Sequence, residues 1–126
     1  MPTPQQTAEA FSGHRFADAY DALAPDVTWV LVGEGTVLGR EAVVEACDEL
    51  TAELEGTAVE TLRSLSVVGE DAVAVDSVVA YTAADGSRSV VSSCDVYELD
   101  AGSVVRITSY NVELTDALAA GAVAGS

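Results

Sequence analysis

One aspartate stands where a buried strand does not ordinarily hold an acid. Asp95 lies in the stretch SCDVYEL, with apolar residues on both sides, and the chain repeats this mixture of polar and apolar residues in ITSYNVEL. A carboxylate without a partner costs several kcal/mol in such a place, so Asp95 must be solvated, paired, protonated or useful to the protein. A buried carboxyl with a raised pKa can act as a general acid or base near neutral pH.

Two interpretations of Asp95 stay open at this point. In the first, a hydroxyl of Ser93 or Tyr97 hydrogen-bonds the carboxyl and a ligand contacts it. In the second, Asp95 pairs with Arg106 or Arg88 on a neighbouring strand, or reaches solvent, and only holds the strands in register.

The chain has few other reactive groups. Its single histidine, His14, rules out a site built from several histidines, and a surface or capping role in a turn is the simpler expectation for it. Cys47 and Cys94 lack the spacing of a zinc site and are expected to remain thiols. We therefore expect no metal and no cofactor. Trp29 and Tyr81 serve either as core residues or as a flat wall for an apolar ligand.

The elements that position these groups follow from the sequence pattern. Residues 3–24 predict two short helices separated by Ser12 and Gly13, and Pro25 stops the second. Residues 26–32 predict a strand, which ends in the loop GEG. Residues 40–56 predict a third helix, because apolar residues recur on one stripe from Val43 to Leu54.

The rest of the chain is predicted to be β-structure. Apolar and β-branched runs at 57–68, 72–82, 87–99 and 103–114 are separated by turn sequences short enough for hairpins. This order predicts an α+β domain in which the N-terminal helices cover one face of a curved sheet. We expect one domain over residues 1–126, with 115–126 either a flexible tail or a short helix.

Charge and hydropathy limit the partners. The chain has 21 acidic residues against five basic ones, for a net charge of -16, so nucleic acid and anionic membranes are disfavoured. We see no signal peptide or membrane segment in the sequence, and a cytoplasmic location is expected. Both faces of the predicted sheet are apolar, which favours a homodimer through the outer sheet face.

The order of elements, with DVTWVLVGEG, LGREAVVEAC and above all SSCDVYELDAGSVVRITSYNVEL, resembles the nuclear transport factor 2-like superfamily in its SnoaL-like bacterial branch. The resemblance extends from about Thr7 to Leu114. It implies a cone, in which a curved antiparallel or mixed sheet wraps around three N-terminal helices and leaves a pocket open at one end. The GEG loop is then the expected flexible edge of the pocket entrance. Members of the superfamily include isomerases, dehydratases, cyclases, epoxide hydrolases and non-catalytic binding proteins.

The resemblance also implies positions for a site. Matching the last two strands to ketosteroid isomerase places Asp95 at that enzyme's oxyanion-hole aspartic acid, which an apolar site keeps neutral. The same match places Asn111 where an aromatic residue lines the pocket. Strand alternation puts four further residues on the concave face, namely Ser93, Tyr97, Ile107 and Ser109.

The known catalytic sets of the superfamily are incomplete in this chain. At the position of the general-base aspartate of ketosteroid isomerase this chain has Leu31, or Val30 if the loop is gapped differently. The first helix has no tyrosine at the position of that enzyme's second oxyanion donor. Ser93 replaces the arginine of limonene epoxide hydrolase. Scytalone dehydratase uses two histidines, and SnoaL-type cyclases use an aspartate and a histidine, for which only His14 is available.

Two classes of function therefore stay open. In the first, the protein binds a small, mainly apolar molecule, with an isomerase, cyclase or dehydratase type of activity that uses Asp95. Its ligand-binding residues are Trp29, Leu31, Ser93, Tyr97, Ile107, Ser109 and Asn111. In the second, the protein is a non-catalytic dimeric module whose own side chains fill the pocket.

Overall fold

The β-rich second half of the chain forms the larger part of one six-stranded sheet. The computed structural model describes residues 2–115, 118 and 121. Its elements follow in the order α1 (Pro4–Ser12), η1 (Phe16–Asp18), η2 (Tyr20–Ala22), β1 (Leu23–Leu31), β2 (Gly35–Leu38), α2 (Arg40–Glu53), β3 (Ala58–Val68), β4 (Ala72–Thr82), β5 (Arg88–Asp100) and β6 (Ser103–Leu114).

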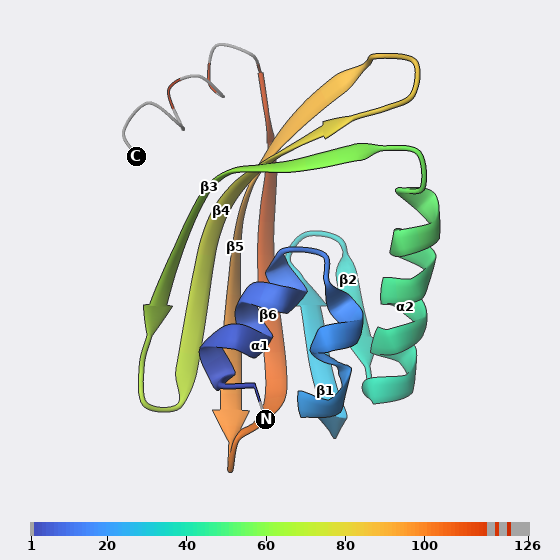
Figure 1. Ribbon diagram of the computed structural model, residues 1–126. Coiled ribbons are helices and arrows are strands. Elements are labelled where there is room, and N and C mark those ends of the chain that lie inside the picture. Colours follow the sequence, from blue (N-terminus) through green and yellow to red (C-terminus); the bar gives the residue numbers. More distant parts are fainter. Residues whose placement is uncertain (1, 116–117, 119–120, 122–126) are drawn as a thin grey trace.

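The sheet has the strand order β2-β1-β6-β5-β4-β3. Neighbouring strands are antiparallel except for β1 and β6, which are parallel, so the sheet is mixed. Both helices lie on one face of this sheet, with α1 against β4 and the neighbouring strands β3 and β5, and with α2 beside β1 (Figure 1). The upper ends of β3, β4 and β5 bend over towards α2 (Figure 1). The predicted α+β class with a curved sheet is confirmed.

The prediction of three N-terminal helices is not confirmed, because the described residues contain two α-helices, α1 and α2. Thr3 and Gln6 form a capping box at the start of α1. The second predicted helix is replaced by the 3₁₀ turns η1 and η2. His14, at φ 64°, turns the chain out of α1, and β1 already begins at Leu23, two residues before Pro25. The segment between these points is too short for a stable α-helix.

The GEG sequence is the turn of a hairpin rather than an open loop. Gly33 has φ 82°, a conformation that glycine adopts without strain. The chain then returns as β2, a strand the sequence pattern did not predict, and β2 pairs with the end of β1. The helix predicted at 40–56 is confirmed as α2, and Val43 and Cys47 on its apolar stripe are fully buried.

The main core lies between the helices and the concave face of the sheet. Phe11 stands at its centre and makes edge-to-face contacts with Phe16, Trp29 and Tyr97. A smaller cluster, formed by Val78, Ala80 and Val90, packs with Leu62 and Leu114. Strand alternation places these three residues on the convex face of the sheet.

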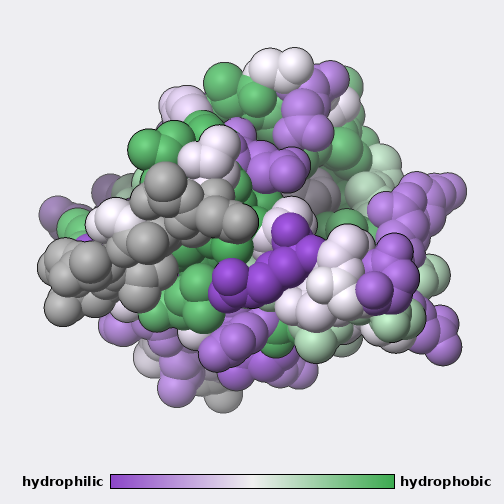
Figure 2. All heavy atoms as spheres, turned by 90° about the horizontal axis from the view of Figure 1, so that it is seen from above, coloured by the Kyte–Doolittle hydropathy of each residue, from purple (hydrophilic) through white to green (hydrophobic). Residues whose placement is uncertain are grey.

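The convex face also carries exposed apolar residues on the edge strand β3 and on the interior strand β6. Leu65 and Val67 on β3 are 49% and 60% exposed, and Tyr110 and Val112 on β6 are 50% and 59% exposed. The end of the molecule viewed from above likewise presents hydrophobic residues beside hydrophilic ones (Figure 2). No helix of the described residues is both long enough and apolar enough to cross a membrane. The tail expected at 115–126 falls almost entirely outside the described residues.

Candidate functional site

A cavity of about 220 Å³ lies between the end of α1 and the concave face of the sheet. Its apolar wall comes from aromatic and aliphatic side chains of the core. Its polar groups come from α1, from the turn after it and from the inner faces of β4, β5 and β6. The residues that line it include Phe11, Ser12, His14, Phe16, Trp29, Leu31, Ser77, Tyr81, Ser93, Asp95, Ser109 and Asn111.

Asp95 lies in the wall of this cavity because the alternation of β5 turns it to the concave face. The residue is 9% exposed. The Ser12 hydroxyl donates a hydrogen bond of 2.8 Å to Asp95 Oδ2, and Ser109 is the cross-strand neighbour on β6. Among the described residues no arginine is within ion-pair distance of Asp95, and Arg106 instead lies 3.5 Å from Glu98.

Burial raises the pKa of the Asp95 carboxyl above its ordinary value, because the charged form loses its hydration. The hydroxyls of Ser109 and Ser12 and the neighbouring His14 oppose this shift in part. The Asp95 carboxyl therefore keeps its proton to a higher pH than an exposed aspartate does.

Ser12 connects Asp95 to a deeper tyrosine. Its hydroxyl oxygen lies 2.6 Å from the Tyr97 hydroxyl, and Tyr97 is 1% exposed. Because the single Ser12 hydrogen points to Asp95, Tyr97 donates to Ser12 and the three groups form a chain of hydrogen bonds. Burial raises the pKa of Tyr97 well above its ordinary value, so it keeps its proton and can donate.

The direct bond from Tyr97 to Asp95 considered from the sequence is thus made through Ser12. Sequence reasoning did not select Ser12 as a site residue, because it treated Ser12 only as a break between helices. The signal that could have found it was a hydroxyl at the end of a helix whose apolar side must pack on the strand of Asp95.

His14 also lines the cavity, instead of lying in a surface or capping position. Its left-handed conformation directs the ring between Phe16 and Tyr81, which it meets edge to face. The His14 Nε2 atom lies 3.2 Å from the Tyr81 hydroxyl, and Nδ1 is buried without a partner among the described residues. Burial lowers the pKa of His14, against the opposing effect of Asp95, so the ring is neutral at pH 7.

The other residues singled out from the sequence divide into two groups. Trp29, Leu31, Ser93, Ser109 and Asn111 line the cavity. Two side-chain hydrogen bonds fix this wall, from the Trp29 indole to Ser109 at 2.9 Å and from Ser93 to Asn111 at 2.7 Å. Two residues do not line the cavity but lie in the buried core around it, namely Tyr97 and Ile107.

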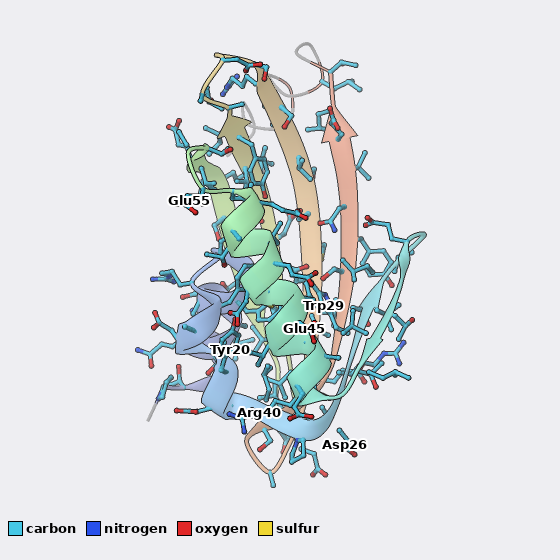
Figure 3. All side chains as sticks on the ribbon, turned by 90° about the vertical axis from the view of Figure 1, so that its right-hand side faces the viewer. Tyr20, Asp26, Trp29, Arg40, Glu45 and Glu55 are labelled. Atoms are coloured by element: carbon cyan, nitrogen blue, oxygen red, sulfur yellow. The ribbon has the colours of Figure 1, made fainter. Side chains whose placement is uncertain are left out.

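A larger groove of about 1070 Å³ lies between α2 and the 3₁₀ turns η1 and η2. Tyr20, Arg40 and Glu45 mark its course beside the helix (Figure 3). The groove is open to solvent, its charged residues lie at the surface, and the Tyr20 hydroxyl is already bonded to Asp48 at 2.7 Å. We therefore place the chemistry at the smaller cavity, which holds the buried carboxyl.

Neither cysteine belongs to the cavity wall. Cys47 is buried on α2, where burial raises its pKa to about 12, and Cys94 is half-buried on β5. Both are free thiols in the structure. Within the described part of the chain no group of three or more histidine, cysteine, aspartate or glutamate side chains is arranged to hold a metal ion.

Comparison with known proteins gives a family and a fold. Residues 5–107 match the family model of the SnoaL-like domain. No match was found among curated proteins.

Three solved structures are similar to this chain. An NTF2-like protein of unknown function from Cytophaga hutchinsonii has a TM-score of 0.75 at 24% identity, over 84% of this chain and 93% of that one. An NTF2-like protein from Burkholderia xenovorans has a TM-score of 0.68 at 18% identity, over 98% of both chains. An LEH-like epoxide hydrolase from M. tuberculosis has a TM-score of 0.63 at 19% identity, over 86% of this chain and 81% of that one.

Proposed function

Since the chain belongs to the SnoaL-like domain family, we propose that its cavity binds a small, mainly apolar molecule and that Asp95 exchanges a proton with it. The observation that carries this proposal is a nine-tenths buried carboxyl that faces a cavity and is not bonded to an arginine among the described residues. A carboxyl serving only strand register would be expected to have such a partner.

The residues that line the cavity indicate which kind of ligand fits it. Phe11, Phe16 and Trp29 offer aromatic surface, while Ser93 on β5 and Asn111 on β6 offer polar contacts. An apolar ring compound that carries a carbonyl or hydroxyl group matches this arrangement, with its oxygen directed to Asp95.

The chemistry that Asp95 supports is general acid–base catalysis. Isomerisation, cyclisation and dehydration of carbonyl compounds all require a proton to leave one atom and a proton to reach another. Asp95 can accept the first proton as a carboxylate and return it as a carboxylic acid. The neutral His14 ring is a second group in the cavity that can accept or donate. Leu31, on the same wall, supplies no such group.

Despite the structural similarity to the M. tuberculosis epoxide hydrolase, the proposed function does not include epoxide hydrolysis. Ser93 stands where limonene epoxide hydrolase has its arginine, and its hydroxyl is bonded to Asn111. The alternative of a module whose own side chains fill the pocket is disfavoured by the open volume beside Asp95.

We test the proposal by carbon-detected NMR of the Asp95 carboxyl, with naphthol as the probe. We expect a pKa well above the ordinary value near 4 and a shift of that pKa when naphthol is added. The Asp95→Asn variant serves as control, because it keeps the shape of the site and removes the titrating group. A normal or lowered pKa that naphthol does not move, with naphthol binding equal in both proteins, would sink the proposal.

We further propose that the protein forms a homodimer through the convex sheet face. This face carries four exposed apolar residues on β3 and β6, which support the proposal, namely Leu65, Val67, Tyr110 and Val112. A second copy of the chain presents the same residues and can cover them in a two-fold arrangement.

A further inference from the structure

A second cavity of about 370 Å³ adjoins the one that holds Asp95. It lies on the other side of the end of α1, against β3 and β4. Ser12 and Ser77 line both cavities, so the two spaces meet at these small side chains. Along the inner face of β4, Val75 lies in the second cavity and Val79 in the first, with Ser77 between them.

Ser77 is a buried serine at the boundary between the two cavities. The residue is 4% exposed, and it lines both spaces. A serine hydroxyl can donate and accept hydrogen bonds, so a ligand that passes this point can bond to it.

The second cavity is polar where the first is mainly apolar. Thr61 and Ser64 on β3 bring hydroxyl groups to it, and Glu9 and Arg15 bring one negative and one positive charge. Hydrogen bonds from Ser66 and Gln5 lower the pKa of Glu9. Glu9 therefore stays ionised and its charge offsets that of Arg15. A neutral group with several hydroxyls fits this set of donors and acceptors better than an ion does.

The volumes of the two cavities also favour a ligand that occupies both of them. Small-molecule sites usually enclose about 300–1,000 Å³. The cavity beside Asp95, at about 220 Å³, lies below this range, whereas the two cavities together lie within it.

We propose that the two cavities form one bipartite site for an amphipathic molecule, with an apolar ring system beside Asp95 and a neutral, hydroxyl-bearing end group among Arg15, Thr61 and Ser64. The molecule passes between Ser12 and Ser77, and the Ser77 hydroxyl bonds to it at this point. The inference rests on the proposed function and adds the chemical class of the ligand.

The test uses four probes with the same ring. Naphthol occupies only the first cavity. The glyceryl ether of a dihydroxynaphthalene adds a tail with two hydroxyls, its propyl ether has a tail of equal length without them, and its carboxymethyl ether has an anionic tail. Calorimetry and the fluorescence of Trp29, the only tryptophan, report binding. We expect the glyceryl ether to bind about tenfold more tightly than the propyl ether, as two or three added hydrogen bonds would give.

The double variant Thr61→Val/Ser64→Ala removes two hydroxyls from the second cavity at exposed positions, where folding should be little affected. We expect it to reduce the ratio of glyceryl-ether to propyl-ether affinity by several-fold. Ser92→Ala, which removes a hydroxyl from the convex face, is the matched control and should leave the ratio unchanged.

The outcomes separate this inference from the proposed function. If naphthol binds but the two neutral ethers bind equally, the bipartite site is wrong and the first cavity stands alone. Preference for the carboxymethyl ether overturns the assignment of a neutral end group. If no probe binds, both proposals fail together. The inference is also wrong if Thr61→Val/Ser64→Ala and Ser92→Ala change the ratio of glyceryl-ether to propyl-ether affinity equally.

Discussion

The hydroxyl oxygen of Ser12 lies 2.8 Å from Asp95 Oδ2, which ties the end of α1 to the middle of β5 across 83 positions of the chain. The bond fixes one carboxyl oxygen, and the Tyr97 hydroxyl behind it fixes Ser12. A buried acid is therefore oriented by the first helix, and the acid–base properties of the cavity depend on how that helix packs.

Ser12→Ala is expected to raise the pKa of Asp95 further. The Ser12 hydroxyl stabilises the carboxylate and so lowers this pKa against the effect of burial. Loss of one such bond changes the relative free energy of the two forms by about 1 kcal/mol, which corresponds to somewhat less than one pKa unit. NMR titration of the carboxyl measures the change. Ser92→Ala is the control, and an unchanged or lowered pKa in Ser12→Ala contradicts the assigned bond.

Asp95→Asn is expected to become more stable relative to the wild type as the pH rises. The pKa of Asp95 is raised in the folded protein, so the folded state binds the proton more tightly than the unfolded chain. The stability from this protonation is fully present below the ordinary value of 3.8 and is lost as the pH rises through the folded pKa. Each unit of pKa difference contributes about 1.4 kcal/mol.

Urea denaturation of both proteins between acidic and neutral pH measures this difference, because the effects of the other carboxylates cancel in the comparison. The prediction is wrong if the difference between the two free energies of unfolding stays constant with pH, or if the wild type gains stability relative to the variant as the pH rises. Either result would show that the pKa of Asp95 is not raised in the folded protein.

The sequence pattern predicted correctly the elements that have strong hydrophobic periodicity. It was wrong where tertiary packing determines the backbone conformation of a segment. The stripe on α2 and the four long β-runs were recoverable, because burial repeats at a fixed spacing along them. Phe16 and Leu23 have helical spacing too, yet they pack on the core from 3₁₀ turns and a strand. The spacing of apolar residues indicates which side chains are buried, but more than one backbone conformation can bury the same side chains.

The site was predictable in part for the same reason. Alternation along β5 and β6 placed Asp95, Ser93 and Ser109 on one face correctly. Ser12 and His14 could not be placed in this way, because their positions depend on one left-handed residue and on how α1 crosses the sheet.

His14 is expected to remain neutral at pH 7 and to titrate below its ordinary pKa of 6.5. Since burial lowers this pKa, the unfolded chain binds the proton first, and stability is lost as the pH falls below about 6.5. NMR of the imidazole is unambiguous because the chain has one histidine. In Asp95→Asn the pKa of His14 should fall further, as the carboxylate that supports its charge is absent. A pKa at or above 6.5, or one that does not respond to Asp95→Asn, contradicts the shared environment.

Val112→Asp is expected to dissociate the proposed homodimer. Val112 is 59% exposed on β6, beside Tyr110 on the same convex face. A stable dimer usually buries about 1,200–2,000 Å² in total, and a charge in the middle of such an interface, doubled by the two-fold axis, weakens association at least tenfold. Light scattering coupled to size exclusion measures the mass.

Val59→Asp is the matched control for this substitution. Val59 is 40% exposed on β3, where its pairing with Tyr81 places it on the concave face, and it receives the same change of charge. Because the chain already has a net charge of -16, both variants increase general repulsion equally, and only the variant in the interface should change the mass. A wild-type protein that stays monomeric at high concentration, or equal dissociation in both variants, would exclude the convex face as the contact between copies.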